Sequence, residues 1–582
     1  MSPFRVWAPK AKRVEVRVRG EQLPMSAGES GWWSAEMSSF EPGMDYAFVL
    51  DGSEPLPDPR SPWQPHGING PSRTVDHAMF PWTDRNWQAG PLSAGVFYEL
   101  HIGTFTPEGT FKAAIGKLDH LVRLGITHVE LMPVAEFSGS RGWGYDGVHL
   151  YAPHHAYGEP DDLKRLVDAC HARGLAIVLD VVYNHLGPAG NHLDRFAPYF
   201  TDRYATPWGR AVNFDGPFSD EVRRFFCDNA LVWLRDYHFD GLRLDAVHAI
   251  IDTSATHFLE QLACEVVELE ARIGRHLELI AESDLNDPRI VRPQEVGGYG
   301  IDAQWSDDFH HALHSVLTGE RDGYYVDFGA LADLAKAFQR VFVNDGRYSA
   351  FRKRRHGKPA TGISGHRFLG YLQNHDQIGN RAKGERSSHL TSLRRLKVGA
   401  TLVFTAPFIP MLFQGEEWGA SSPFLYFTNH KDPELGRAVT EGRRREFAAF
   451  GWRPEDIPDP QARETFERSK LDWNERDEEP HAGLLAWHSR LIQLRREIPA
   501  LSDGRLEQVR TSFDESAKWF VVKRGTVVVA CNLSDIEQRV PVGLGHCSEL
   551  LLASESNVQF AHDVVALPSD SVAILISAQP DG

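Results

Sequence analysis

The stretch Gly241-Leu-Arg-Leu-Asp-Ala-Val-His248 begins as an apolar strand and then breaks into polar side chains, with a carboxylate at the break. Three other stretches place a carboxylate in the same way: Asp180-Val-Val-Tyr-Asn-His185, Leu279-Ile-Ala-Glu-Ser-Asp284 and Gln373-Asn-His-Asp-Gln-Ile-Gly-Asn380. One such Asp is usually a helix cap or a turn residue. Four of them in order favour another interpretation, because a closed barrel of parallel strands gathers the carboxyl ends of its strands at one mouth. We therefore expect these side chains to share one pocket.

Eight apolar segments, each followed by a helical or loop stretch, predict the strands of that barrel. They lie at residues 96–100, 126–132, 176–182, 241–246, 277–281, 301–305, 368–372 and 409–413. The stretch 161–174 starts with two Asp residues and has Gly at its end, as an amphipathic helix does. The alternation predicts an α/β fold, a (β/α)8 TIM barrel, over residues 91–495. Two longer loops, 133–160 and 186–218, are rich in Gly, Pro, His and aromatic residues, and we expect them to be functional.

Both ends of the chain show the alternation of apolar and polar residues that is typical of strands. Residues 1–90, with Arg13-Val-Glu-Val-Arg-Val-Arg19, predict an N-terminal β-sandwich, and residues 496–582, with Lys518-Trp-Phe-Val-Val-Lys523, predict a C-terminal antiparallel β-domain. Trp32 and Trp33 of the first domain have two interpretations. They stack on a sugar, or they fill the sandwich core or its interface with the barrel, which is the commoner use of such large side chains.

Composition excludes several classes of protein. The 582 residues carry a net charge of -17, which would repel nucleic acid, so the run from Arg352 to Arg355 is expected to be a solvated loop. The sequence after Met1 lacks a basic segment followed by an apolar one, and there is no uninterrupted apolar stretch of about 18 residues, so we expect a cytoplasmic protein that does not enter a membrane. The cysteines are widely spaced and odd in number, which predicts reduced, mostly buried thiols. They are Cys170, Cys227, Cys264, Cys531 and Cys547.

The four carboxylate-bearing stretches, in their order, resemble the four signature regions of the α-amylase superfamily, glycoside hydrolase family 13. Phe4-Arg-Val-Trp-Ala-Pro9 and Pro42-Gly-Met-Asp-Tyr46 look like the sandwich that precedes the barrel in glycogen-acting members. Within the superfamily, Ala281-Glu-Ser-Asp-Leu-Asn-Asp-Pro-Arg289 and Gln373-Asn-His-Asp-Gln-Ile-Gly-Asn-Arg381 are similar to those of the members that release trehalose. The resemblance implies a retaining endo-hydrolase that cuts the α-1,4 bond next to the terminal trehalose unit of maltooligosyltrehalose. It also implies a metabolic partner, maltooligosyltrehalose synthase.

Two carboxyl groups about 5 to 5.5 Å apart are needed to cleave a glycosidic bond with retention, one as nucleophile and one as acid and then base. Asp245 and Glu282 fit these roles, and the resemblance makes Asp376 a third acid that stabilises the transition state. Arg243 precedes Asp245 by two residues, so the two side chains face the same side of the strand and the cation orients the carboxylate. On its own, this pair also fits a buried structural ion pair.

The resemblance further implies a set of sugar-binding residues. Tyr145, in Gly142-Trp-Gly-Tyr-Asp-Gly147, matches the position where a ring stacks on the sugar, although this stretch is also typical of a tight turn with a buried Trp. Glu417 is a sugar ligand or a cap. The predicted substrate-binding residues are Tyr145, Asp146, His185, Arg243, His248, Asp307, Asp308, His310, His311, His375, Gln377 and Asn380.

No cofactor and no required metal are predicted. Asn184 matches a position that binds calcium in some relatives, but a calcium site needs several convergent oxygen ligands, and the sequence does not supply them in a recognisable pattern.

Three alternative functions were weighed. A glycogen-branching transferase would share the barrel and the covalent intermediate, but it has a Ser-His-Asp-Glu-like sequence where this chain has Asn374-His-Asp-Gln377. A plain α-amylase or a debranching enzyme fits the third stretch less well. A noncatalytic glucan-binding protein would have lost a reacting carboxylate, and all three are present.

Overall fold

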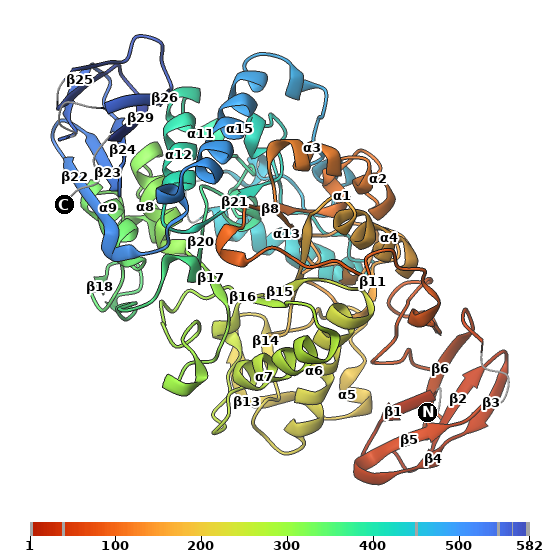
Figure 1. Cartoon of the computed structure of the whole chain (residues 1–582). Helices are drawn as coiled ribbons and strands as arrows, with labels where there is room; N and C mark the ends of the chain where they lie inside the picture. Colours follow the sequence, from red (N-terminus) through yellow and green to blue (C-terminus); the bar gives the residue numbers. More distant parts are fainter. Residues whose placement is uncertain (1–3, 38–40, 449–451, 544–547, 562, 578–582) are drawn as a thin grey trace.

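A computed structural model of the chain describes residues 4–37, 41–448, 452–543, 548–561 and 563–577. Eight parallel strands close into a barrel, each hydrogen-bonded to the next strand along the sequence and the last to the first (Figure 1). The predicted (β/α)8 barrel is therefore confirmed, with most strands one to three residues shorter than expected. The strands are β8 (Phe97–Leu100), β9 (His128–Leu131), β12 (Ala176–Val181), β15 (Gly241–Leu244), β16 (Glu278–Ala281), β17 (Ala303–Trp305), β20 (Phe368–Gly370) and β21 (Ile409–Phe413).

The register of the parallel strands places charged side chains side by side inside the barrel, near its mouth. Arg243 of β15 is level with Asp180 of β12 and with Ile280 of β16. Because residues that are level in parallel strands face the same side, Asp180 and Arg243 both point into the barrel. The interior also holds the buried Glu99 and Glu130 and a cluster of apolar side chains: Phe97, Val178, Ile280, Ala303, Trp305, Leu369, Tyr371, Ile409 and Met411.

Helices surround the barrel (Figure 1). The helix predicted at 161–174 is α4 (Pro160–His171), whose first turn is stabilised by Asp162 accepting a hydrogen bond from the backbone N–H of Glu159 at 3.2 Å. The other helices of six or more residues are α3 (Leu118–Leu124), α6 (Ser219–Asp236), α7 (Phe258–Ile273), α8 (Asp307–Thr318), α9 (Leu331–Arg340), α12 (Leu393–Thr405), α13 (Pro433–Ala448), α14 (Arg463–Arg468) and α15 (His481–Glu497). The shorter ones are α1 (Ile102–Phe105), α2 (Phe111–Ile115), α5 (Leu193–Phe196), α10 (His375–Gly379) and α11 (Ser387–Leu390).

The N-terminal part consists of two antiparallel sheets, which lie at the end of the molecule opposite the C-terminal sheets (Figure 1). Trp32 contacts the guanidinium of Arg60, which in turn donates to Asp228 of the barrel at 2.7 Å, so this ring packs at the interface between sandwich and barrel. Trp33 packs against the hydrophobic core and donates from Nε1 to the carbonyl of Ala8. The strands are β1 (Phe4–Trp7), β5 (Trp32–Ala35) and β4 (Ser26–Ala27) in one sheet, and β3 (Glu21–Pro24), β2 (Val14–Val18), β6 (Asp45–Leu50) and β7 (Ser72–Arg73) in the other.

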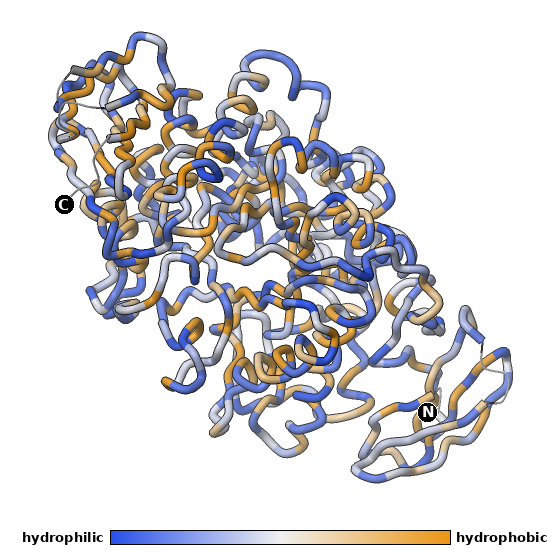
Figure 2. Tube along the Cα trace, in the orientation of Figure 1, coloured by the Kyte–Doolittle hydropathy of each residue, from blue (hydrophilic) through white to orange (hydrophobic). Residues whose placement is uncertain are grey.

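The C-terminal part is an antiparallel β-domain, as predicted. Hydrophobic segments, orange in Figure 2, run through these strands and through the barrel, whereas many connecting loops are blue. Apolar residues from the two C-terminal sheets, such as Val521, Val540 and Val565, form a buried cluster. The strands are β22 (Val509–Asp514), β23 (Trp519–Arg524), β24 (Val527–Asn532), β29 (Ser571–Ser577) and β26 (Ser548–Ala553) in one sheet, and β25 (Gln538–Pro541), β28 (Val564–Leu567) and β27 (Gln559–Ala561) in the other.

Both long loops of the barrel contain short antiparallel pairs of strands. The first holds β10 (Ala135–Glu136) and β11 (His149–Pro153), and the second holds β13 (Phe200–Thr206) and β14 (Gly209–Val212). Two small sheet strands, β18 (Tyr348–Ser349) and β19 (Arg354–Arg355), form a further pair.

Most cysteines of the described residues are buried, as predicted, and all of these described cysteines are free. Cys170, Cys227 and Cys531 are free and buried, whereas Cys264 is free and exposed. Cys547 lies outside the described residues. Among the helices of the described chain, none is long and apolar enough to span a bilayer.

Candidate active site

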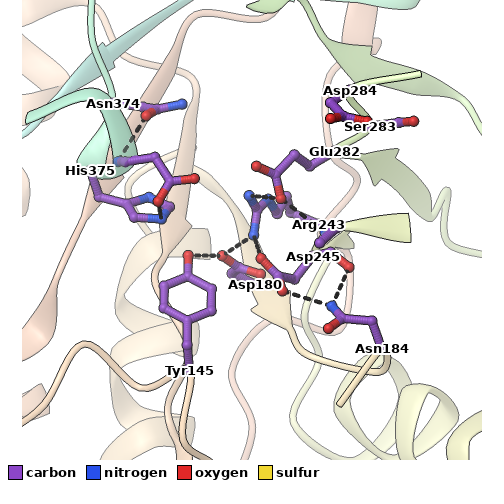
Figure 3. Close-up of polar contacts among 12 residues, drawn as sticks. Tyr145, Asp180, Asn184, Arg243, Asp245, Glu282, Ser283, Asp284, Asn374 and His375 are labelled. Carbon is purple, nitrogen blue, oxygen red and sulfur yellow. Dashed lines mark hydrogen bonds and ion pairs between the residues drawn. The ribbon is translucent and has the colours of Figure 1, made fainter. Parts of the chain in front are cut away.

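Arg243 holds three carboxylates together at the mouth of the barrel (Figure 3). Its Nη1 donates to Asp180 Oδ2 at 2.6 Å and to Asp245 Oδ1 at 2.9 Å, and its Nη2 lies 2.8 Å from Glu282 Oε2. The guanidinium is fully buried and lies 4.1 Å from the ring centroid of Trp305. The three acids follow or end adjacent strands β12, β15 and β16, so the structure brings together the side chains that the sequence placed in one pocket. Sharing one guanidinium keeps the two predicted reacting acids close, as the retaining mechanism requires.

The turn after β15 fixes the two predicted reacting acids relative to each other. Asn184 donates from Nδ2 to Asp245 Oδ2 at 2.7 Å and to the Asp245 carbonyl at 2.8 Å. Ala246 has a φ of 40°, a left-handed conformation that is unfavourable for a residue with a Cβ. In this conformation its N–H donates to Glu282 Oε2 at 2.9 Å. The local backbone strain is therefore coupled to the placement of the predicted acid.

Buried charge shifts the protonation of the innermost acid. Burial raises the pKa of Asp180 to about 7, with a further contribution from Asp245, while Arg243 lowers it. Tyr145 donates to Asp180 Oδ2 at 2.6 Å. Asp180 was not among the predicted site residues, although it begins one of the quoted stretches. It is 2% exposed, and its Oδ2 accepts from both Arg243 and Tyr145, so it fixes the positions of these two side chains.

Asp376 comes from the opposite side of the mouth, in the first turn of α10. Asn374 caps this helix by accepting from the N–H groups of Asp376 and Gln377, at 2.9 and 3.3 Å, and Gln377 Oε1 accepts from Asn374 N–H at 3.0 Å. The Asp376 side chain is 39% exposed, and its Oδ1 accepts from Asn380 Nδ2 at 3.1 Å. Burial and the nearby Glu282 raise the pKa of Asp376, against a lowering effect of His375. Asp376 therefore faces the two other predicted catalytic acids, while Gln377 serves mainly as a cap.

Tyr145 joins the two sides of the mouth. Its ring stacks on His375, with ring centroids 5.1 Å apart and planes inclined by 23°, while its hydroxyl reaches Asp180. Trp143 of the same loop packs edge-on against His375 and donates to the Leu425 carbonyl at 2.9 Å. Trp143 is therefore buried while Tyr145 is half-buried. The interpretation as a turn with a buried Trp does not exclude the interpretation as a position where a ring stacks on the sugar.

His185 forms a stacked pair at the rim. Its Nδ1 contacts Asn184 Oδ1, and its ring lies parallel to that of Trp208, with centroids 4.8 Å apart. Burial lowers the pKa of His185 to about 4, so the ring is neutral near pH 7. Trp208 is 46% exposed and was missed in the sequence; an aromatic residue in a loop rich in Gly, Pro and His was the available signal. Asp146, 37% exposed in its side chain, lies 3.8 Å from His430.

The residues after β17 divide into two sets. Asp307 accepts from the Tyr371 hydroxyl at 2.6 Å, and burial together with Glu282 raises its pKa to about 8, so it belongs to the mouth. Asp308 instead accepts from the N–H groups of Val343 and Asn344, both at 2.7 Å, and from Asn286. All three donors bond Oδ2 of Asp308, so this side chain fixes backbone and side-chain groups of the protein, which favours a structural function.

The two neighbouring histidines also differ. His310 is fully buried, with Nδ1 2.7 Å from the Leu372 carbonyl and Nε2 3.0 Å from the Tyr325 hydroxyl, so both ring nitrogens are used inside the protein. His311 is half-buried and packs against the ring of Tyr324 at 4.5 Å; burial lowers its pKa to about 3. Of these two histidines, only His311 is partly exposed to solvent.

The basic run from Arg352 to Arg355 was expected to be a solvated loop, but its first residue forms an ion pair at the edge of the site. Arg352 Nη1 lies 3.0 Å from Asp284 Oδ2, and His248 Nε2 lies 4.0 Å from Asp284 Oδ1. Asp284 follows Glu282 by two residues, so Arg352 is brought to the edge of the site from far along the chain. The three residues after Arg352 are exposed, as predicted.

Glu417 has no exposed surface and is not placed to bind a sugar. Its carboxylate accepts from the Tyr98 hydroxyl at 3.1 Å and contacts His120 Nε2 at 2.8 Å. Of the two interpretations of Glu417, the geometry favours the structural one.

One group among the described residues has the donor types of a metal site. Glu136, His154 and His155 bring ligand atoms within 4.8 Å of one another. The carboxylate of Glu136 already lies 3.0 Å from His154 Nδ1 and 2.8 Å from His155 Nδ1, and it accepts the His155 N–H at 2.9 Å. If Nδ1 of His154 bound a metal, its buried Nε2–H would be left without an acceptor among the described residues. A hydrogen-bonded triad therefore fits these residues better than a metal centre.

Similar proteins are known over nearly the full length of the chain. Residues 76–203 match the family described as alpha amylase, catalytic domain, and residues 504–574 match a domain of unknown function. A malto-oligosyltrehalose trehalohydrolase of Arthrobacter ramosus is 51% identical over 556 residues, which cover 94% of this chain and 95% of that protein. One of Mycobacterium tuberculosis is 47% identical over 586 residues, covering all of both chains. The crystal structure of a provisionally assigned alpha amylase from Salmonella typhimurium has a TM-score of 0.90 at 39% identity, covering 99% of this chain and 97% of that one.

Proposed function

The chain belongs to the malto-oligosyltrehalose trehalohydrolases of the alpha-amylase family, and from this premise we propose that Asp245, Glu282 and Asp376 carry its reaction. The activity is the hydrolytic release of trehalose from maltooligosyltrehalose. The observation that carries the assignment of residues is the contact of Asp245 and Glu282 with one buried guanidinium at the ends of neighbouring strands. The shared guanidinium keeps the two acids close together, which supports a retaining mechanism, since that mechanism uses closely spaced carboxyl groups.

In the first step, an oxygen of Asp245 attacks the anomeric carbon on the glucan side of the bond. The bond from that carbon to O4 of trehalose breaks, and Glu282 gives its proton to this oxygen, so that trehalose leaves. Asn184 and Arg243 each bind one oxygen of Asp245, which fixes the direction of attack. The product of this step is a glycosyl ester on Asp245.

In the second step, water replaces trehalose. The carboxylate of Glu282 removes a proton from this water, whose oxygen attacks the anomeric carbon, and Asp245 leaves as a carboxylate. Asp376, held by the capped first turn of α10, binds hydroxyl groups of the distorted sugar and stabilises the positive charge that develops in both steps. Tyr145 supplies a ring face for the same sugar, and Trp208 offers an exposed ring at the rim.

The proposal extends to the surroundings of the reaction. The substrate must come from an enzyme that converts the reducing end of a maltooligosaccharide to a terminal trehalose unit, that is, a maltooligosyltrehalose synthase. A cytoplasmic location and the absence of a nucleic-acid partner remain predictions from the sequence and its net charge of -17.

Product analysis tests the function directly. Purified protein is incubated with maltooligosyltrehalose and, separately, with the maltooligosaccharide of the same length, and sugars and new reducing ends are measured. We expect rapid release of trehalose from the first and little cleavage of the second. Comparable cleavage of both would identify a general amylase, and new α-1,6 bonds on a long glucan would identify a branching transferase.

A further inference from the structure

Glu99 is a buried carboxylate that binds a residue of the site at two points. It lies on β8 inside the barrel and is 1% exposed. Its Oε2 accepts from the backbone N–H of His375 at 3.1 Å, and its Oε1 contacts His375 Nδ1. The first barrel strand is thereby tied to the start of α10, and both the backbone and the ring of His375 are fixed.

Neighbouring rings also fix the orientation of the His375 imidazole. Its ring stacks on Tyr145 (Figure 3). It also meets Trp143 edge-on, with centroids 5.5 Å apart, so it cannot rotate freely. With Nδ1 held by Glu99, the other nitrogen, Nε2, lies 3.5 Å from Oδ1 of Asp376. The three side chains form a row: the carboxylate of Glu99, the imidazole, and the partly exposed carboxylate of Asp376.

The charge of this imidazole follows from its neighbours. Burial alone lowers the pKa of His375, but Glu99 and Asp376 outweigh this effect and raise it to about 9. Arg243 of β15 opposes protonation of His375, and His375 in turn helps burial to lower the pKa of His101, which follows β8, to about 3. Glu130, level with Glu99 on β9, has its pKa raised well above the ordinary value by burial and by Glu99, and its two buried carboxyl oxygens have no hydrogen-bond partner among the described residues.

We propose that Glu99 is a positioning residue that keeps His375 as an imidazolium, with its Nε2–H held between Asp376 and the sugar of the cleavage subsite. This inference rests on the proposed function, because it assigns Glu99 to the same site. A protonated ring donates from both nitrogens, whereas a neutral ring with Nδ1–H on Glu99 would present only a lone pair to Asp376. The fixed cation beside Asp376 then helps to orient this acid towards the sugar.

The test combines titration of His375 with kinetics of Glu99→Gln, which keeps the shape of the side chain and removes its charge. Imidazole resonances of histidine-labelled protein are followed by NMR, and the resonance lost in His375→Gln identifies the residue. We expect a midpoint near 9 in the wild-type protein and one lower by about two pH units or more in Glu99→Gln. Turnover, kcat, should fall by at least about tenfold, with a smaller change in KM.

Glu130→Gln is the matched control, since it replaces a neighbouring buried glutamate that does not touch His375. We expect its titration and its kinetics to equal those of the wild-type protein. An unchanged His375 midpoint in folded Glu99→Gln would overturn the proposal. If Glu99→Gln does not fold, a wild-type midpoint at or below about 6.5, the ordinary value for histidine, would overturn it as well. A wild-type protein that releases no trehalose would refute the proposed function, while the titration would still decide the state of His375.

Discussion

A network around Asp240, at the N-terminal end of the barrel, and the acids at the mouth contain the same kinds of charged groups but expose them to different degrees. At the N-terminal end, Asp240 accepts from Trp87 at 2.8 Å, from His171 at 2.9 Å and from the N–H of Ile177 at 2.9 Å. His171 is bonded at its other nitrogen to Asp84, at 2.8 Å, which also accepts from His238. In this N-terminal network both oxygens of Asp240 and both nitrogens of His171 have a protein partner, and Asp240 is 1% exposed.

At the mouth, the acids keep free surface. The side chains of Asp245, Glu282 and Asp376 are 10%, 14% and 39% exposed, and the pKa of Asp376 is raised. The difference shows that a barrel uses the starts of its strands for stability and their ends for chemistry. A substitution at the mouth should therefore affect turnover first, and one in the N-terminal network should affect stability first.

The largest effect is expected for Asp245→Asn. An amide cannot form the glycosyl ester, so kcat should fall by about 10⁴-fold or more, while the thermal unfolding midpoint stays close to the wild-type value. Trehalose release and thermal unfolding are measured on the same preparation. Near-normal turnover in a folded variant would exclude Asp245 as nucleophile.

Arg243→Met should reduce both stability and turnover, because Arg243 is both buried and central to the mouth. Its loss leaves Asp180 without its charged partner in the barrel interior, and breaking such a buried pair costs about 3–5 kcal/mol of unfolding free energy. Denaturant unfolding measures this loss, and activity should be lost with it. If stability is unchanged, the mouth is less dependent on charge pairing than the geometry indicates.

Asp240→Asn should have the opposite profile to Asp245→Asn. One hydrogen bond to a charged partner is lost and His171 loses a counter-charge, so unfolding free energy should fall by about 2 kcal/mol. At 25 °C, kcat/KM for maltooligosyltrehalose should remain within about twofold of the wild-type value, since the fold persists. A large drop in kcat with unchanged stability would contradict the division between the two ends.

A further effect, visible only as a dependence of stability on pH, concerns Asp307. Its pKa of about 8 in the folded protein lies above the ordinary value of about 3.8 to 3.9, so between these values the folded state binds a proton that the unfolded state does not. Wild-type stability should therefore decrease, relative to Asp307→Asn, as the pH rises from 5 to 8. Urea unfolding at several pH values measures this difference. Asp308→Asn, which weakens the acceptor of three hydrogen bonds, should be less stable than wild type, although burial raises the pKa of Asp308 as well, to about 6.

Much of the fold was predictable because its signals are local. Apolar runs interrupted by polar residues mark the ends of strands, and all eight barrel strands were found in this way. The same signals predicted that Asp245 and Glu282 lie at the ends of neighbouring strands. The individual substrate-binding residues were harder to predict, since adjacent residues such as Asp307 and Asp308 have the same side chain and the same sequence context.

The sequence by itself determined the barrel, its two flanking β-domains and the carboxylates at its mouth, because periodicity and strand ends are properties of short segments. The tertiary structure alone decided which atoms meet. It placed Glu99 against His375, 276 residues away, and Arg352 against Asp284, and it turned Asp308 towards backbone N–H groups. Such contacts depend on distances of about 3 Å between segments far apart in the chain, which no local pattern encodes.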